Sequence, residues 1–188
     1  ARLDRLRASL AKALAVADPD LVVLEILNEP HGLRDSAAWN RCQRRLAATV
    51  RRAAPRHTII CTGDMHGGID GLLRCEPITQ DRNIVYSFHF YDPHNFTHQG
   101  ATWGFDGWRH LRDVPYPATR EELERVADGL ESPRGREVLR WSAAHEGASS
   151  PWNAEAIDRR IATAAAWSKE HDVPLYCGEF GVYRRFAP

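Results

Sequence analysis

The sequence lacks the features of several large protein classes. It has 25 Lys and Arg residues against 25 Asp and Glu residues, so it carries no net charge that would attract nucleic acid or an anionic membrane surface. Its longest apolar run, residues 21–27, is interrupted by Glu25 and is much shorter than the roughly 20 residues that a membrane-spanning helix needs. We therefore expect a soluble chain that binds neither nucleic acid nor a membrane.

Several short motifs are also missing. No GxGxxG or GxxxxGK follows a predicted strand, which argues against a nucleotide-binding open sheet, and no GxSxG is present to support a serine hydrolase. Its four cysteines show no CxxC or other metal-ligand spacing, and we expect them to be buried free thiols: Cys42, Cys61, Cys75 and Cys177. We expect no cofactor and no metal ion.

What the sequence does contain is an alternation of helical and strand patterns. Helical spacing over residues 3–17 is followed by a strand at 21–27, a helix at 36–54 with Ser36 as its N-cap, and a strand at 57–62. Further strands are predicted at 83–91 and 173–177, the last preceded by a helix capped by Asn153. Nearly continuous apolar strands are typical of a parallel sheet that is covered on both faces. The pattern favours an α/β barrel over a doubly wound open sheet, with functional groups at the carboxyl ends of the strands.

Residues 92–152 interrupt this alternation. They are rich in Pro, Gly, Trp and His, and they contain a short helix from Thr119 in which Glu122 completes a capping box. We interpret residues 1–188 as one partial catalytic domain with a long elaborated loop at about 92–152. Three tryptophans in helical patterns are expected in the core: Trp39, Trp141 and Trp167.

Two glutamates are candidates for chemistry, because Glu29 and Glu179 each end an apolar strand. Hydrolysis of a glycosidic bond needs two such carboxyl groups, one on each side of the bond. Glu25 lies inside a strand, and we expect it to have a buried, hydrogen-bonded structural role. The alternative for Glu29 is that it only forms part of a strand-to-helix turn.

A metal site is the alternative for the histidines. His89, His94 and His98 lie near Asp92, but they straddle a proline and a loop, whereas the HExxH pattern fixes two ligands on one helix face. A metal site is therefore not predicted.

Three segments together resemble the signature segments of the family 5 cellulases: Leu-Glu-Ile-Leu-Asn-Glu-Pro-His at 24–31, Ser-Phe-His-Phe-Tyr at 87–91 and Gly-Glu-Phe-Gly at 178–181. Residues 95–101 also resemble a loop of bacterial members. The resemblance implies a (β/α)8 TIM barrel, of which this chain holds strands four to seven, and a retaining mechanism by double displacement. It implies that Glu29 is the acid/base and Glu179 the nucleophile.

The resemblance also implies a set of substrate contacts. Asn28 corresponds to the residue that hydrogen-bonds the sugar 2-hydroxyl, and His89 and Tyr91 correspond to a pair that lines the glycone subsite. His31 either reaches a substrate hydroxyl or makes a polar contact at a helix start. Trp103 either stacks on a sugar ring or packs within its loop.

The expected partner is a polysaccharide or oligosaccharide. We expect an endoglucanase acting on β-1,4-glucan, with mannan, xyloglucan or β-1,3-glucan as alternatives within the family. A non-catalytic carbohydrate-binding remnant is the alternative of another class, because half of the barrel is absent from this sequence. A polymeric glucan cannot cross a membrane, so the parent enzyme is expected to be secreted or periplasmic, although no leader is visible to indicate this. The oligomeric state stays open.

Overall fold

The computed structural model describes residues 2–145 and 152–183, which fall into two compact units. The first unit comprises Ala1–His89 and Thr163–Glu179, and the second comprises Phe90–Ala162 and Phe180–Pro188. The long helix α7 (Ala154–His171) contributes its first part to the second unit and its last part to the first.

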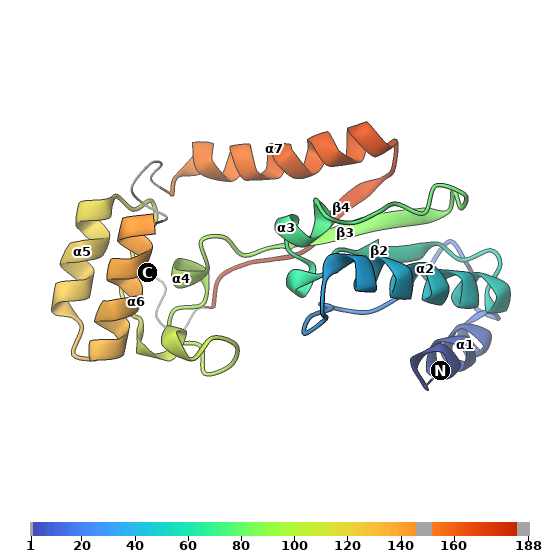
Figure 1. The fold of residues 1–188 in the computed structure, drawn as a ribbon, viewed down its shortest axis with the longest axis horizontal. Coiled ribbons are helices and arrows are strands. Elements are labelled where there is room, and N and C mark those ends of the chain that lie inside the picture. Colours follow the sequence, from blue (N-terminus) through green and yellow to red (C-terminus); the bar gives the residue numbers. More distant parts are fainter. Residues whose placement is uncertain (1, 146–151, 184–188) are drawn as a thin grey trace. The chain divides into compact units, whose positions relative to one another are not determined.

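The first unit is built on a four-stranded sheet in the order β1-β2-β3-β4. Figure 1 labels β2, β3 and β4 of this sheet. Its strands are β1 (Leu24–Glu25), β2 (Ile59–Thr62), β3 (Ile84–Phe90) and β4 (Leu175–Phe180). Leu24 pairs with Ile59, and Ile59 with Ile84, so that β1, β2 and β3 run parallel. The four parallel strands and their helices form half of a (β/α)8 barrel, which confirms the predicted partial barrel.

The strand predicted at 21–27 is much shorter in the structure. Only Leu24 and Glu25 pair, while Leu21 is 83% and Val23 52% exposed. The reason is that β1 lies at an edge of this sheet and pairs with β2 alone, so one side of the apolar run has no strand to bond with. The last strand also differs, since β4 extends to Phe180 and therefore includes Glu179.

Helices α1 (Arg2–Leu14) and α2 (Ser36–Ala53) pack together in the first unit. The expectation that Ser36 caps α2 is wrong. Asp35 is the N-cap, and its carboxylate accepts from the Ala38 N–H at 2.6 Å. Ser36 already lies within the helix, and its hydroxyl donates instead to Asp64 at 2.9 Å.

The inner face of α2 fixes the carboxyl end of β2. Trp39, only 2% exposed, donates its indole N–H to the Thr62 carbonyl at 2.7 Å, and Gln43 accepts from the Thr62 N–H at 2.9 Å. Both backbone groups of the last β2 residue are thus satisfied by helix side chains rather than by another strand. These two hydrogen bonds fix the position of Thr62, where the chain leaves the sheet.

The chain turns sharply after β2, through η1 (Met65–Gly67) and α3 (Ile69–Leu72). Gly63 and Gly71 lie against backbone here: a Cβ on Gly63 would overlap Gly71, and a Cβ on Gly71 would overlap the Asp64 carbonyl. The turn therefore needs glycine at both positions because two backbone segments touch.

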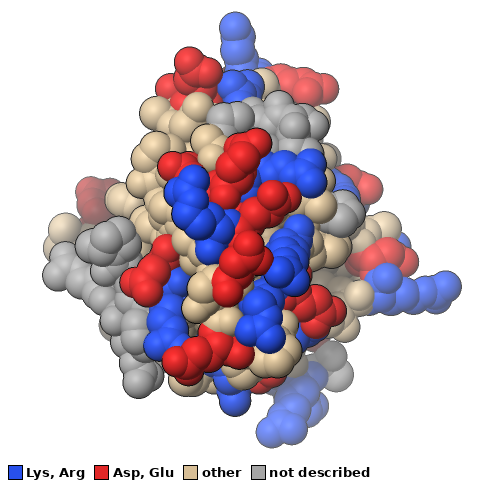
Figure 2. Space-filling view, turned by 90° about the vertical axis from the view of Figure 1, so that its left-hand side faces the viewer, with Lys and Arg blue, Asp and Glu red and all other residues tan. Residues whose placement is uncertain are grey.

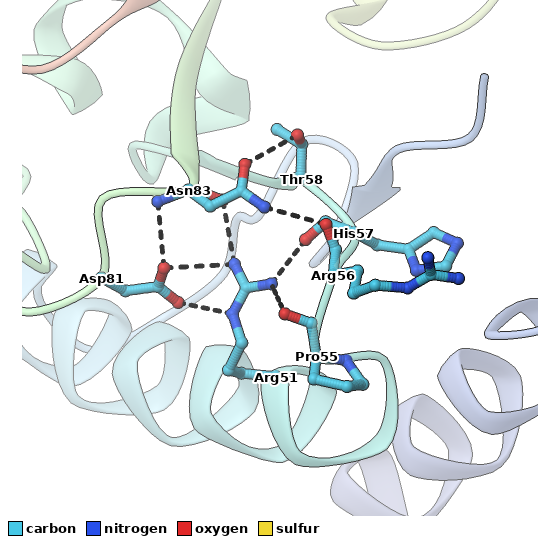
Figure 3. A network of polar contacts seen from close by, with 7 residues as sticks. All are labelled: Arg51, Pro55, Arg56, His57, Thr58, Asp81 and Asn83. Carbon is cyan, nitrogen blue, oxygen red and sulfur yellow. Dashed lines mark hydrogen bonds and ion pairs between the residues drawn. The ribbon is translucent and has the colours of Figure 1, made fainter. Parts of the chain in front are cut away.

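Arg51 joins three segments at the amino ends of β2 and β3 (Figure 3). Its guanidinium contacts both carboxylate oxygens of Asp81, at 2.8 and 3.2 Å. It also donates to the carbonyls of Pro55, His57 and Asn83. One planar group thereby ties the end of α2 to the chain entering both strands.

The second unit is helical, where a long loop with one short helix was predicted. It contains α4 (His94–Thr97), η2 (Asp106–His110), α5 (Arg120–Gly129), α6 (Pro133–His145) and the first part of α7. A separate core holds α5 and α6 together, with Leu111, Leu139 and Ala127 at most 1% exposed. The predicted capping box is confirmed, because Thr119 accepts from the Glu122 N–H and Glu122 from the Thr119 N–H.

Predictions for the tryptophans and cysteines are confirmed in part. Trp39 and Trp167 are buried, but Trp141 on α6 is 56% exposed, so its assignment to the core is wrong. All four cysteines are free thiols; Cys61 and Cys75 are buried, and the other two only partly.

The second unit carries charges of both signs on the face shown in Figure 2. Ion pairs link Arg120 to Glu124 and Arg140 to Asp128 on this unit. Acidic and basic side chains alternate on this face, as expected for a chain without net charge. Within the described ranges, the helices are all too short or too polar to cross a bilayer.

Candidate active site

Glu29 stands four residues after the end of β1 in an uncommon backbone conformation. Its φ is +45°, in the left-handed region that residues other than glycine seldom adopt. Such conformations persist only where surrounding contacts fix them, and they concentrate at functional sites. The side chain of Glu29 is 35% exposed and points toward His89 on β3.

His89 joins the two glutamates that the sequence singled out. Its Nδ1 lies 2.9 Å from an Oε1 oxygen of Glu29 and 3.3 Å from an Oε2 oxygen of Glu179. One ligand atom from each of the three residues lies within 4.8 Å of the other two. The three side chains thus meet at the carboxyl ends of the strands, after β1 for Glu29 and near the ends of β3 and β4 for His89 and Glu179.

The surroundings of His89 hold its ring in place. The histidine side chain is 6% exposed, and its ring lies against Gly178 and Gly67, which present no side chain to it. A β-bridge to Gly68 fixes the backbone of His89. The imidazole is therefore held rigidly between the carboxylates.

These three side chains are also the group, among the residues the structure describes, that could hold a metal ion. Two carboxylates and an imidazole suit a divalent cation. The same arrangement suits two carboxylates flanking a scissile bond.

Two of the histidines considered as a metal site from the sequence, His94 and His98, make other contacts. His94 contacts Asp92 at 3.1 Å, and its ring stacks on those of His98 and Trp108.

His31 lies beside Glu29. Its Nδ1 is 2.7 Å from the Glu29 carbonyl oxygen, and its ring stacks on His66 with 4.3 Å between centroids and 12° between planes. His66 comes from the turn after β2 and was not predicted as a site residue. Its position in the sequence could have indicated it, because His66 follows the end of a predicted strand just as Glu29 does. Asn28, immediately before Glu29, is exposed.

The remaining predicted site residues lie in the second unit. The Tyr91 ring packs edge-on against His98, with 5.1 Å between centroids. Trp103 is 52% exposed and contacts the Tyr183 ring edge-on at 4.7 Å. Trp103 therefore combines a ring contact with substantial exposure to solvent.

The pKa values of two titratable groups, Asp92 and Tyr176, differ from their ordinary values. Burial opposes ionisation of Asp92, but hydrogen bonds and positive charge from His94 and Arg160 outweigh it and lower its pKa. Burial raises the pKa of Tyr176 on β4, and the charges of Glu25 and Glu179 add to the effect. Glu25 is only partly buried, so the expected burial is not complete, and its hydrogen-bonded structural role stays a prediction.

The fold is that of a (β/α)-barrel protein, and the comparison with protein families gives its class. The model of the cellulase family, glycosyl hydrolase family 5, matches residues 2–185. The chain therefore belongs to glycosyl hydrolase family 5.

Individual relatives agree with this assignment. Endoglucanase C of Acetivibrio thermocellus is 30% identical over 161 residues, which cover 86% of this chain and 44% of the relative. Cellodextrinase A of Ruminococcus flavefaciens is 27% identical, over 88% of this chain and 39% of the relative. The crystal structure of endoglucanase Cel5A from Thermotoga maritima matches the fold with a TM-score of 0.72 at 24% identity, over all of this chain and 49% of that one. The chain thus spans less than half the length of these relatives.

Proposed function

We propose that this chain carries the catalytic carboxylates of a retaining glycoside hydrolase that cleaves β-1,4-glucan. The supporting observation is the spacing of Glu29 and Glu179. One carboxyl oxygen of each lies within 4.8 Å of the other, and both lie close to His89 Nδ1. Retaining glycosidases hold their carboxyl groups about 5–5.5 Å apart, whereas inverting enzymes need about 6.5–9.5 Å to admit a water molecule. The short separation favours retention.

The reaction proceeds by two displacements. A Glu179 carboxylate oxygen attacks the anomeric carbon and forms an ester while Glu29 transfers its proton to the departing glycosidic oxygen. Glu29, now ionised, then takes a proton from a water molecule, whose oxygen attacks the anomeric carbon and releases Glu179. His89 Nδ1, which lies 2.9 Å from Glu29 and 3.3 Å from Glu179, keeps the oxygens of both side chains in place through the two steps.

The substrate contacts are proposed on the family resemblance together with the exposure of each side chain. Asn28 precedes Glu29 and is exposed, so that its amide is available to the sugar 2-hydroxyl. Tyr91 and Trp103 are proposed as sugar contacts on the family resemblance, whereas His31 contacts the Glu29 carbonyl and is not assigned to the sugar. The exposed face of Trp103 can stack on a pyranose ring.

β-1,4-Glucan is the proposed substrate because similar proteins are named endoglucanases and a cellodextrinase. One similar structure is titled as a hyperthermophilic endo-β-1,4-glucanase in complex with substrate. Mannan, xyloglucan and β-1,3-glucan are the substrates to compare with it. Since a polymeric glucan stays outside the membrane, we place the parent enzyme outside the cytoplasm, secreted or periplasmic.

The test is hydrolysis of cellohexaose by the full-length protein, with Glu29→Gln, Glu179→Gln and the surface control Glu76→Gln. The Glu76 side chain is 63% exposed and pairs with Arg44 away from the site. Loss of the general acid is expected to slow hydrolysis about 10²- to 10⁴-fold. The Glu179 variant should lose as much or more, and the Glu76 variant should match the wild type.

Product stereochemistry separates the roles. The first product seen by proton NMR should have the β configuration, and azide should rescue Glu29→Ala with a β-glycosyl azide and Glu179→Ala with an α-glycosyl azide. An α product from the wild type would refute retention. Binding of cellohexaose without turnover would support a carbohydrate-binding remnant instead. Activity that is lost with EDTA and restored by a divalent cation would support the metal interpretation.

A further inference from the structure

Two consecutive backbone carbonyls at the candidate acid/base are held by a pair of stacked histidines. His31 donates from Nδ1 to the Glu29 carbonyl at 2.7 Å, since a carbonyl can only accept. The backbone N–H of His66 donates to the next carbonyl, that of Pro30, at 3.1 Å. The two imidazoles stack at 4.3 Å. The loop after β1 and the turn after β2 are thus joined at Glu29 and Pro30.

The turn that supplies His66 has an unusual backbone. Met65 and His66 both have positive φ, +53° and +60°, and Glu29 itself has a φ of +45°. Left-handed residues other than glycine are uncommon, and two in succession require contacts that compensate for their strain. The His31–His66 stack and the bond to Pro30 are such contacts. Uncommon conformations on both sides of one contact indicate that this contact fixes the position of Glu29.

We propose that His31 and His66 are positioning residues that hold the Glu29 backbone so that its carboxyl group reaches His89 and the scissile bond. This rests on the proposed role of Glu29 as acid/base. His31 supplies a side-chain donor to Glu29, and His66 supplies a flat ring for stacking and a backbone donor. Neither histidine exchanges a proton with the substrate.

A positioning role has a different kinetic signature from a sugar contact. Displacement of an acid/base by about 1 Å can cost on the order of 10²-fold in rate. The loss should appear in kcat on a substrate whose leaving group must be protonated. It should be small on 2,4-dinitrophenyl β-cellobioside, whose leaving group departs without a proton. A sugar contact would instead raise KM and would affect both substrates.

The test uses the full-length protein with three variants of His31 and His66. His31→Phe keeps a flat ring and removes the donor, whereas His31→Asn keeps a donor near the position of Nδ1 and removes the ring. His66→Ala removes the stack and leaves the backbone bond possible. We expect kcat on cellohexaose to fall about 10- to 100-fold in His31→Phe, with rescue to within about 5-fold in His31→Asn. On the dinitrophenyl substrate each variant should stay within about 3-fold of the wild type.

A second measurement does not depend on glycosidase activity. The Nδ1 nitrogen of His89 gives an imidazole ¹⁵N NMR signal whose chemical shift reports its hydrogen bond with Glu29. This signal should move in His31→Phe and stay near its wild-type position in His31→Asn. Each variant is first shown to unfold at the wild-type temperature.

The outcomes are distinguishable. Equal losses on both substrates, an effect on KM alone, or an unmoved His89 signal in His31→Phe overturns the positioning role even where the wild type is a cellulase. A wild type without glycosidase activity would refute the proposed function. In that case a shifted His89 signal in His31→Phe would still support the positioning of Glu29.

Discussion

Replacement of Arg51 by methionine should destabilise the first unit more than its surface position suggests. The guanidinium makes five hydrogen bonds, two to Asp81 and three to carbonyls of Pro55, His57 and Asn83 (Figure 3). The side chains of Arg51 and Asp81 are only 22% and 23% exposed. A methionine side chain occupies much of the same space, but it has no donor for the five acceptors.

The magnitude follows from the kind of bond that is lost. A hydrogen bond to a charged group contributes about 1.5–3 kcal/mol net, but bonds that share one guanidinium are not additive, and several of the acceptors can turn to water. We expect a loss of about 2–4 kcal/mol in the free energy of unfolding, a range centred below the roughly 3–5 kcal/mol found when a fully buried pair is broken. Arg51→Lys should show about half of this loss in the free energy of unfolding, because an ammonium group cannot reproduce the planar set of donors of a guanidinium.

The assay is urea unfolding of the full-length protein, with Arg52→Met as the matched control. Arg52 is the next residue on α2, is exposed and donates to the hydroxyl of Thr49. Its replacement should change stability by no more than about 0.5 kcal/mol. Hydrogen exchange adds a local reading: the Ile59 N–H bonds to the Asn83 carbonyl, which also accepts from Arg51, and its protection should fall in Arg51→Met.

The reasoning would be refuted by equal effects of Arg51→Met and Arg52→Met, since the network would then contribute no more than an exposed arginine. A double-mutant cycle with Asp81→Asn checks the main partner. The two changes should be less than additive, because each removes the same bidentate contact.

Three further predictions concern other parts of the chain. Because contacts in the folded state lower the pKa of Asp92, its contribution to stability is present above the unfolded value of about 4 and is lost as pH falls below it; Asp92→Asn should flatten this acid dependence in urea titrations. Gly71→Ala should reduce stability by more than about 2 kcal/mol or prevent folding, because the new Cβ would overlap backbone, and a wild-type midpoint would contradict the close approach. Cys61 and Cys75 should resist thiol reagents until the protein unfolds, because burial raises the pKa of both, that of Cys75 to about 12; fast labelling of either in the native protein would exclude this.

The sequence predicted the strands and the glutamate positions because these depend on local patterns. Apolar runs that end in Asn-Glu-Pro or Gly-Glu mark strand ends without reference to distant residues. The helix at 36–54 followed for the same reason, since its apolar spacing is regular. The choice of N-cap was wrong because Asp35 and Ser36 are both good caps, and only the contact of Ser36 with Asp64 on another loop decides between them.

The helices of the second unit were harder to predict. Pro133 and Gly135 lower the helical signal of α6, although proline is well suited to the first turn. Gly135 is explained only by the fold, because a Cβ there would meet the His110 carbonyl and a Leu130 methyl group. The exposure of Trp141 likewise depends on which side of α6 faces α5. Such contacts join positions that are far apart in the sequence.

The same distinction applies within the candidate site. Glu29, His89 and Glu179 could each be found from the strand that carries it, but the left-handed backbone of Glu29 could not. That conformation depends on His66, a residue 37 positions later in the turn after β2, whose N–H reaches Pro30 and whose ring stacks on His31. The identity of the candidate site residues is thus encoded locally, whereas their placement depends on contacts between successive βα loops. Substitutions in the turn after β2 should therefore alter the placement of Glu29 while leaving each strand intact.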